Sequence, residues 1–270
     1  MADLRKAIRQ HVPAAVQKRL RPRRFHAFCI GPMKTGTLSL GRMLNDCYKS
    51  AHEPEPEALA RRIERPPADP AGFLRARDRR LWLEMESSHL LVHFVEDLVE
   101  LFPDALFVFT VRDCYTWMAS YVNHHLGHDD TKDFWKRMRR LHFGPREGFD
   151  PLERELEELG LFTVDGYLSY WQWHNARVLE CVPAERLLVL RTAEISNRSE
   201  DLADFLGVPR NTISLKKSHS NRARKDSGVI ERLDPDYLRQ RAEALCEPMM
   251  QRLFPEIQGP RQAFDSWRKR

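Results

Sequence analysis

Residues 25–40 read FHAFCIGPMKTGTLSL, and this stretch decides the fold. The apolar run 25–30 breaks at Gly31-Pro32, and a helical spacing of apolar residues follows it. We therefore predict a strand, a tight loop and a helix. A loop at such a junction directs backbone N–H groups and the positive end of a helix at one spot, which suits an anion. The loop adds the charge of Lys34 and the hydroxyl donors of Thr35, Thr37 and Ser39.

The composition is that of a globular protein with one large α/β domain. The chain has 270 residues, 42% of them hydrophobic and 31% charged, and a formal net charge of +5. No apolar run approaches the ~20 residues that span a bilayer, and the N-terminus lacks the apolar core of a signal peptide. The five cysteines form no Cys-x-x-Cys pair, so we expect reduced thiols and a cytoplasmic protein.

Strands and helices alternate along most of the chain. We expect strands at 25–30, 81–86, 105–111 and 187–190. A helix passing through Leu40, Met43 and Leu44 follows the loop, and further helices are expected at 90–101, 113–126, 153–159, 164–182 and 201–206. Such alternation predicts an α/β fold with a central parallel sheet and helices on both of its faces, a three-layer sandwich.

We expect an N-terminal basic arm at 1–24 and a single α/β domain at 25–270. Within the arm, residues 2–20 have an apolar stripe opposite Arg and Lys, which packs on the domain or rests on a membrane surface. The domain has two expected insertions. The one near 50–80 is rich in Pro, Arg and Glu and reads as irregular apart from a short helix near 57–63, and the one near 127–160 begins as a polar loop.

The loop is close to a Walker A motif but lacks the Lys-Ser/Thr pair directly after the second glycine, and the G-x-G-x-x-G fingerprint is absent. Its order, Pro-x-Lys-Thr-Gly-Thr-x-Ser-Leu at 32–40, resembles the phosphosulfate-binding loop of sulfotransferases that use 3′-phosphoadenosine 5′-phosphosulfate (PAPS). A plain strand–helix connector is the alternative interpretation.

A second pattern follows the strand at 105–111. Arg112 stands at the strand exit and Ser120 lies eight residues further on. Taken alone, these residues fit an arginine paired with a carboxylate and a serine facing solvent. Their spacing after such a strand resembles the second sulfotransferase signature, which implies that the pair holds the 3′-phosphate of the nucleotide.

The late strand and the helix ending in Phe-Leu-Gly-Val-Pro at 205–209 also resemble the family, although Ile195-Ser196 replaces its Asp-Leu. The basic run 210–225 then contains six Lys/Arg and no acid. It fits a solvated face or a nucleic-acid patch. The family resemblance instead implies a loop over the 3′-phosphate, with four candidate ligands, Lys217, Asn221, Arg222 and Arg224.

The resemblance implies a P-loop-like fold and in-line transfer of a sulfuryl group from PAPS without a metal. Lys34 would hold the phosphosulfate and stabilise charge on the bridging oxygen. The 5′-phosphate would lie in the cradle of Thr35, Gly36, Thr37, Leu38 and Ser39.

Transfer also needs a base for the acceptor's proton. We predict Glu86, nearest the carboxyl end of its strand, with His89 as the second candidate. Three further residues stay open as bases: Glu84, His52 and Glu53. A polar cluster after the Ser120 helix has spacing that could bind a metal, but we expect it to face the acceptor: His124, His125, His128, Asp129 and Asp130.

The loop's Lys-Thr-Gly-Thr resembles the loops of carbohydrate sulfotransferases, which implies a carbohydrate or glycolipid acceptor. A small-molecule acceptor is the alternative, and the two insertions should select the acceptor. No nucleic-acid partner is expected, and the oligomeric state stays open. Two alternatives remain: a nucleotide kinase using ATP and magnesium, and a catalytically silent protein that binds nucleotide or nucleic acid.

Overall fold

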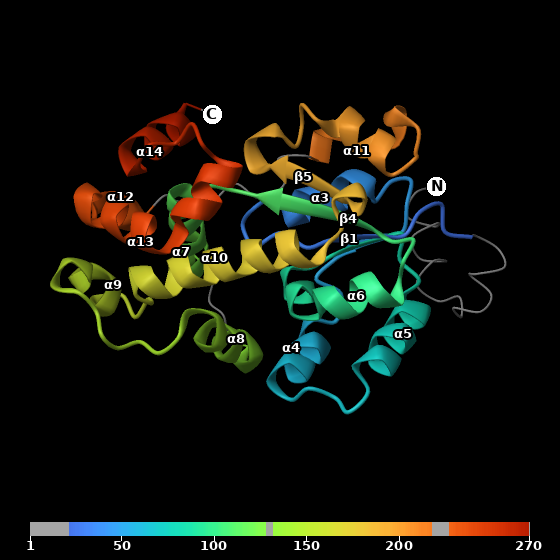
Figure 1. Cartoon of the computed structure of the whole chain (residues 1–270), viewed down its shortest axis with the longest axis horizontal. Coiled ribbons are helices and arrows are strands. Elements are labelled where there is room, and N and C mark those ends of the chain that lie inside the picture. The colour runs from blue at the N-terminus through green and yellow to red at the C-terminus, as the bar shows by residue number, and fades with distance from the viewer. Residues whose placement is uncertain (1–21, 128–131, 218–226, 270) are drawn as a thin grey trace. The chain divides into compact units, whose positions relative to one another are not determined.

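The computed structural model describes residues 22–127, 132–217 and 227–269 (Figure 1). The apolar stripe expected at 2–20 lies outside these residues. Within the described part of the chain, no helix is both long enough and apolar enough to cross a membrane.

A five-stranded sheet in the order β2-β3-β1-β4-β5 forms the centre of the fold. The β2–β3, β3–β1 and β1–β4 pairs are parallel, and Ala27 lies beside Met85 on one side and Leu106 on the other. Helices flank the sheet, so the predicted α/β fold is confirmed. The strands are β1 (Ala27–Cys29), β2 (Ser50–His52), β3 (Met85–Ser87), β4 (Leu106–Val111) and β5 (Leu187–Arg191).

The two faces of the sheet differ because neighbouring residues of a strand point to opposite sides. Ala27 and Cys29 of β1 belong to a buried core that also contains side chains of α3 (Thr37–Leu44) and α11 (Ser199–Phe205). Phe28 has the opposite parity and lies in register with Glu86 of β3 and Phe107 of β4. Glu86 therefore shares the face of Phe28, opposite the face that α3 covers.

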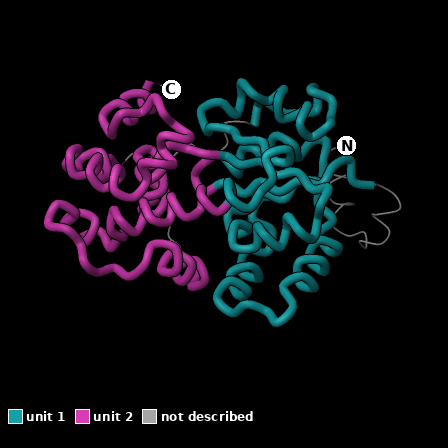
Figure 2. The backbone as a smooth tube through the Cα atoms, viewed as in Figure 1, with its two compact units in different colours: residues 1–31, 36–110, 178–221 teal, residues 32–35, 111–177, 222–270 magenta. Residues whose placement is uncertain are grey.

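The chain divides into two compact units (Figure 2). Unit 1 comprises residues 1–31, 36–110 and 178–221, and unit 2 comprises residues 32–35, 111–177 and 222–270. The single domain expected over 25–270 stays a prediction. The helices that complete unit 1 are α4 (Pro56–Glu64), α5 (Pro70–Leu81), α6 (Val95–Leu101) and the short 3₁₀ turns η1 (His89–Phe94), η3 (Ala184–Arg186), η4 (Thr192–Glu194), η5 (Arg210–Thr212) and η6 (Leu215–Lys217).

The segment 50–80 differs from the expectation of an irregular insertion. It contains the edge strand β2 and two helices, α4 and α5, each with a proline in its first turn. Pro is favoured at this position because the first helical N–H has no partner within the helix. Asp69 caps α5 by accepting the N–H of Gly72 at 2.7 Å. Three-residue β2 has no alternating apolar pattern, so only its pairing with β3 identifies it as a strand.

Unit 2 is helical and packs around aromatic side chains. Trp117, Tyr167, Tyr170 and Trp171 are almost fully buried. The helix α8 lies in the segment that the sequence suggested was loop-like. The helices are α7 (Cys114–Gly127), α8 (Asp133–Phe143), η2 (Pro151–Glu153), α9 (Arg154–Glu158), α10 (Val164–Cys181, whose last four residues belong to unit 1), α12 (Val229–Arg232), α13 (Pro235–Leu253) and α14 (Pro260–Arg268).

Candidate active site

The loop after β1 is held in an uncommon backbone conformation. Lys34 has φ 72°, in the left-handed region that non-glycine residues rarely adopt. The N–H and the hydroxyl of Thr35 both donate to the carbonyl of Pro32, at 3.3 and 2.7 Å, which closes a tight turn around Lys34. The hydroxyl of Thr35 therefore shapes the loop. Strain of this kind persists where the surrounding structure enforces it, and it is concentrated at functional sites.

Gly36 begins α3 and is required by both conformation and space. Its φ is 102°, and a Cβ at this position would lie 2.4 Å from Cδ1 of Ile195. A side chain at this position would adopt an unfavourable φ and would require the terminal methyl group of Ile195 to move. Because the first N–H groups of a helix have no acceptor within it, this entrance is suited to an anion.

Lys34 and Arg112 are electrostatic neighbours within unit 2. Burial, and then the positive charge of Arg112, lower the pKa of Lys34 from 10.5 to about 8. Two cations that repel each other in a partly buried position favour a ligand with several negative charges. Lys34 follows β1 and Arg112 follows β4, so residues beyond the carboxyl ends of two neighbouring parallel strands interact electrostatically.

Arg112 is oriented by its neighbours at the start of α7. Its Nε donates to Oγ1 of Thr116 at 3.1 Å, and its carbonyl accepts the indole N–H of Trp171 at 2.9 Å. The carboxylate of Asp113 accepts the N–H of Thr116 at 2.9 Å and is also bonded by the Thr116 hydroxyl. Asp113 thus caps the N-terminus of α7.

Thr116, Ser120 and Asn123 lie at i, i+4 and i+7, and so form one polar face of α7. The Arg112–Thr116 hydrogen bond turns the guanidinium towards this face, which Ser120 shares. The same face of α7 also binds Ser227, which lies two residues after the basic run 210–225. Oδ1 of Asn123 accepts the N–H of Ser227 at 2.8 Å. Ser227 is thus held about one turn from Ser120.

The first turn of α3 belongs to unit 1. Thr37 and Ser39 are buried, and Leu38 is partly buried. Oγ1 of Thr37 lies 3.3 Å from Nε2 of His52. The backbone carbonyl of Thr37 accepts the hydroxyl of Ser87 at 2.8 Å. The residues at the carboxyl ends of β2 and β3 thus hold the helix that follows the loop.

Glu53, directly after β2, is bound to the residues directly after β3. Its carboxylate lies 2.6 Å from Nδ1 of His89 and accepts the hydroxyl of Ser88 at 2.6 Å and the N–H of His89 at 3.1 Å. Burial opposes ionisation, but His89, His52 and Ser88 together outweigh it and lower the pKa of Glu53 to about 2. Glu53 also has a left-handed φ of 48°. It is thus a fixed, ionised carboxylate at the carboxyl edge of the sheet.

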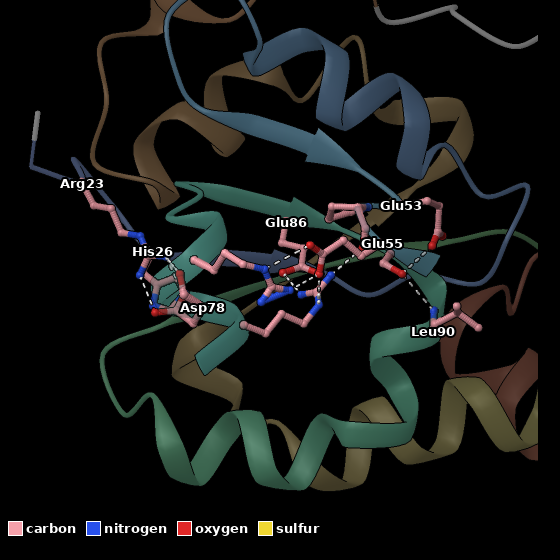
Figure 3. Close-up of polar contacts among 11 residues, drawn as sticks. Arg23, His26, Glu53, Glu55, Asp78, Glu86 and Leu90 are labelled. Carbon is pink, nitrogen blue, oxygen red and sulfur yellow. Dashed lines mark hydrogen bonds and ion pairs between the residues drawn. The ribbon is translucent and has the colours of Figure 1, made fainter. Parts of the chain in front are cut away.

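Glu86, the first choice of base from the sequence, is paired with a buried arginine (Figure 3). Its Oε2 accepts Nη1 of Arg77 at 2.5 Å, and both side chains are buried. Nη2 of Arg77 donates to the carbonyl of Pro54 at 2.6 Å, beside Glu53. In Figure 3, Glu86 and Glu55 both contact the guanidinium of Arg77. Glu53 instead accepts the hydroxyl of Ser88, whose oxygen accepts the N–H of Leu90. Glu84 accepts the backbone N–H groups of Lys49 and Arg24, at 2.7 and 3.0 Å.

The other residues that the sequence suggested for nucleotide, acceptor or metal binding are described in part. Lys217 forms an ion pair with Asp46 on the surface of unit 1. Asn221, Arg222 and Arg224 lie outside the described residues, as do His128, Asp129 and Asp130. His124 and His125 are in the last turn of α7. Among the described residues, no three His, Cys, Asp or Glu side chains form a group that could hold a metal ion.

Two features of the site were not anticipated from the sequence. Thr116 orients Arg112 through a hydrogen bond to Nε. Its position four residues after an arginine at the end of a strand is the sequence signal for this contact. The ring of Trp267 also lies against Arg112, with Arg112 Cζ 4.7 Å from the ring centroid. Trp267 is 155 residues away in the sequence, so no local pattern connects the two.

Comparisons with known proteins bear on the family and on the fold. A family model described as a sulfotransferase domain matches residues 26–224. Among solved structures, a crystal structure of a sulfotransferase from Alicyclobacillus acidocaldarius aligns with 85% of this chain and 94% of its own, at 19% identity and a TM-score of 0.50. At that identity the likeness shows the fold alone. No curated protein sequence matches the chain.

Proposed function

The chain belongs to the sulfotransferase domain family, and we propose that its sulfuryl donor is PAPS and that its acceptor offers a hydroxyl or an amine. Such a donor carries a phosphosulfate at one end of an adenosine and a phosphate at the other. The observation that supports this proposal most is that two positively charged side chains, Lys34 and Arg112, are electrostatic neighbours. Burial and the charge of Arg112 lower the pKa of Lys34 to about 8.

The residues of the loop take the donor's phosphosulfate end in this proposal. Lys34 binds the phosphosulfate and stabilises the negative charge that grows on the bridging oxygen as the sulfuryl group departs. The helix entrance at Gly36, Thr37, Leu38 and Ser39 holds the 5′-phosphate with backbone N–H groups and hydroxyls. Thr35 keeps the turn closed through its two bonds to Pro32.

The 3′-phosphate is proposed to bind Arg112 and Ser120. The bond from Arg112 to Thr116 turns the guanidinium towards the helix face that carries Ser120. A guanidinium offers a planar fork of donors that suits a phosphate, and such charge-assisted bonds are the strong kind. Asn221, Arg222 and Arg224 remain proposed ligands on the family resemblance alone, since they lie outside the described residues.

We propose His89, oriented by Glu53, as the base in place of Glu86. Burial raises the pKa of Glu86, but its carboxylate is already engaged by the buried guanidinium of Arg77. Glu53 and His89 lie after the carboxyl ends of β2 and β3, and His52 connects the same edge to Thr37. Glu53 would orient His89 and stabilise its charged form as the proton is taken, in the manner of other carboxylate–histidine pairs.

The acceptor class is proposed to be a carbohydrate or a glycolipid. The support is the Lys34-Thr35-Gly36-Thr37 sequence, which resembles the loops of carbohydrate sulfotransferases. The chemistry itself resembles phosphoryl transfer, in which a protein contributes mainly positioning and charge stabilisation. For this reason the residues above are assigned to binding, orientation and proton removal.

Calorimetric titration with adenosine 3′,5′-bisphosphate, the product nucleotide, tests the donor directly. We expect micromolar affinity for the wild-type chain, weakened at least about tenfold by Lys34→Ala or by Arg112→Ala, because each removes a charge-assisted contact worth about 1.5–3 kcal/mol. Arg239→Ala is the control, since its side chain is exposed and its partner is Asp236 on the same helix, α13. Tighter binding of ATP with magnesium than of the bisphosphate would favour a kinase instead.

A further inference from the structure

Arg112 is contacted on its flat face as well as on its edge. The guanidinium carbon lies 4.7 Å from the centroid of the Trp267 ring, while Nε donates to Thr116 at 3.1 Å. All three residues belong to unit 2. The indole is partly buried, so it is ordered by packing and still accessible from one side. A cation over the face of a tryptophan is attracted by the negative potential of the ring.

The helix α14 brings Trp267 to this position. Pro260, Ala263 and Phe264 form its buried face, and Trp267 follows on the same face at the next helical interval. The helices α14 and α7 pack against each other, and Arg112 directly precedes the capping residue of α7. Residues of the C-terminal helix therefore reach the start of the helix that follows β4.

The two contacts together determine how the guanidinium is oriented. A long arginine side chain in solution samples many rotamers, and binding must overcome that freedom. The bond to Thr116 fixes one edge of the guanidinium, and the indole fixes its plane. A phosphate bound by two parallel N–H groups needs that plane to be defined beforehand, because the donors of arginine are rigidly coplanar. The indole also gives the arginine a partner that is not an anion, so it does not compete with a phosphate for charge.

We propose that Trp267 is a positioning residue for the nucleotide's 3′-phosphate, acting by holding Arg112 in a phosphate-binding orientation. This inference rests on the proposed function. It extends the nucleotide site to the C-terminal helix, which lies beyond the residues 26–224 that the family model matches.

The test compares two nucleotides that differ only in the 3′-phosphate: adenosine 3′,5′-bisphosphate and adenosine 5′-monophosphate. We expect Trp267→Leu to weaken binding of the bisphosphate by roughly three- to tenfold, the range of a partly buried cation–π contact, and to leave the monophosphate unchanged. Trp267→Phe, which keeps an aromatic face, should restore most of the affinity. In an Arg112→Ala background, Trp267→Leu should have no further effect, because the two residues act as one unit.

Trp82→Leu is the matched control, since Trp82 also stacks on an arginine, Arg23, at 4.2 Å but has no part in the proposed site. Equal losses for both nucleotides would contradict the proposal, as would unchanged binding of the bisphosphate. Tighter bisphosphate binding by Trp267→Leu would overturn it in another way, by showing that the indole occupies the phosphate's place. If the wild-type chain binds both nucleotides alike, the 3′-phosphate site itself fails, and this inference fails with it.

Discussion

Lys34 titrates in a range that ordinary lysines do not reach. Its pKa of about 8 lies below the ordinary 10.5, so the folded chain loses this charge between about pH 7 and pH 9. Near pH 7 the side chain is about nine-tenths protonated, and near pH 9 only about one-tenth. The phosphates of a nucleotide are fully ionised over that interval, because their second pKa is near 6.

We therefore expect the affinity for adenosine 3′,5′-bisphosphate to fall about tenfold from pH 7 to pH 9. Lys34→Arg should remove this dependence, because arginine keeps its charge. Calorimetric titrations at both pH values measure it. A flat profile for the wild-type chain would show that the charge of Lys34 does not act on the bound phosphates.

Some residues of the site could be recognised from the sequence and others could not. Lys34 and Arg112 each follow a strong apolar strand, and parallel strands bring such positions to one edge of a sheet. Glu86 was chosen for its position near the end of its strand, but alternation does not say which face of a strand is turned towards the loop. The structure shows that Glu86 pairs with Arg77, nine residues upstream, and no pattern within the strand indicates this partner.

At the scale of elements, the joint between the loop and α3 depends on Gly36. An alanine there would have a strained φ of 102° and a Cβ 2.4 Å from Cδ1 of Ile195. We expect Gly36→Ala to lower the free energy of unfolding by about 3 kcal/mol, combining backbone strain with overpacking.

Gly207→Ala is the matched variant for this substitution. Gly207 also has a positive φ, 64°, but nothing lies within 4 Å of where its Cβ would be. It should cost only about 1 kcal/mol, the conformational part. Urea denaturation of both variants measures the difference. Equal losses would mean that the close approach of Ile195 has no energetic consequence.

The elements that the sequence did not reveal are those whose stability comes from distant partners. The strand β2 has only three residues, Ser50–His52, and is defined by pairing with β3. Without it, Glu53 cannot be placed beside His89. The helix α5 has a mixed, arginine-rich sequence and is identified by its cap Asp69 and by Pro70 in its first turn. The strand β4 was predicted closely because it is a continuous apolar run. The helices α7 and α10 were predicted closely because they are long and rich in apolar and aromatic residues.

At the scale of the whole molecule, the residues proposed for donor binding and those proposed for proton removal form separate groups. Unit 2 contains Lys34, Arg112, Ser120 and Trp267, and unit 1 contains the entrance of α3 and the Glu53–His89 pair. The chain crosses from one unit to the other between Thr35 and Gly36, inside the loop itself. Donor binding and proton removal are therefore assigned to different groups of residues, which single substitutions can separate.

Glu53→Gln should make this separation visible. The amide keeps the shape of the side chain but cannot stabilise a positively charged His89. We expect the variant to bind adenosine 3′,5′-bisphosphate as well as the wild-type chain does and to lose at least about a hundredfold in the rate of sulfuryl transfer, the usual range for general base catalysis.

The most direct measurement is transfer of the radiolabelled sulfuryl group of PAPS to a panel of glycans and glycolipids. It compares the wild-type chain with Lys34→Ala and Glu53→Gln. The predicted result is labelled acceptor and free adenosine 3′,5′-bisphosphate with the wild-type chain, and neither product above background with the two variants. Label that stays on the nucleotide with every acceptor, or a phosphoryl group moved from ATP in its place, would contradict sulfuryl transfer from PAPS.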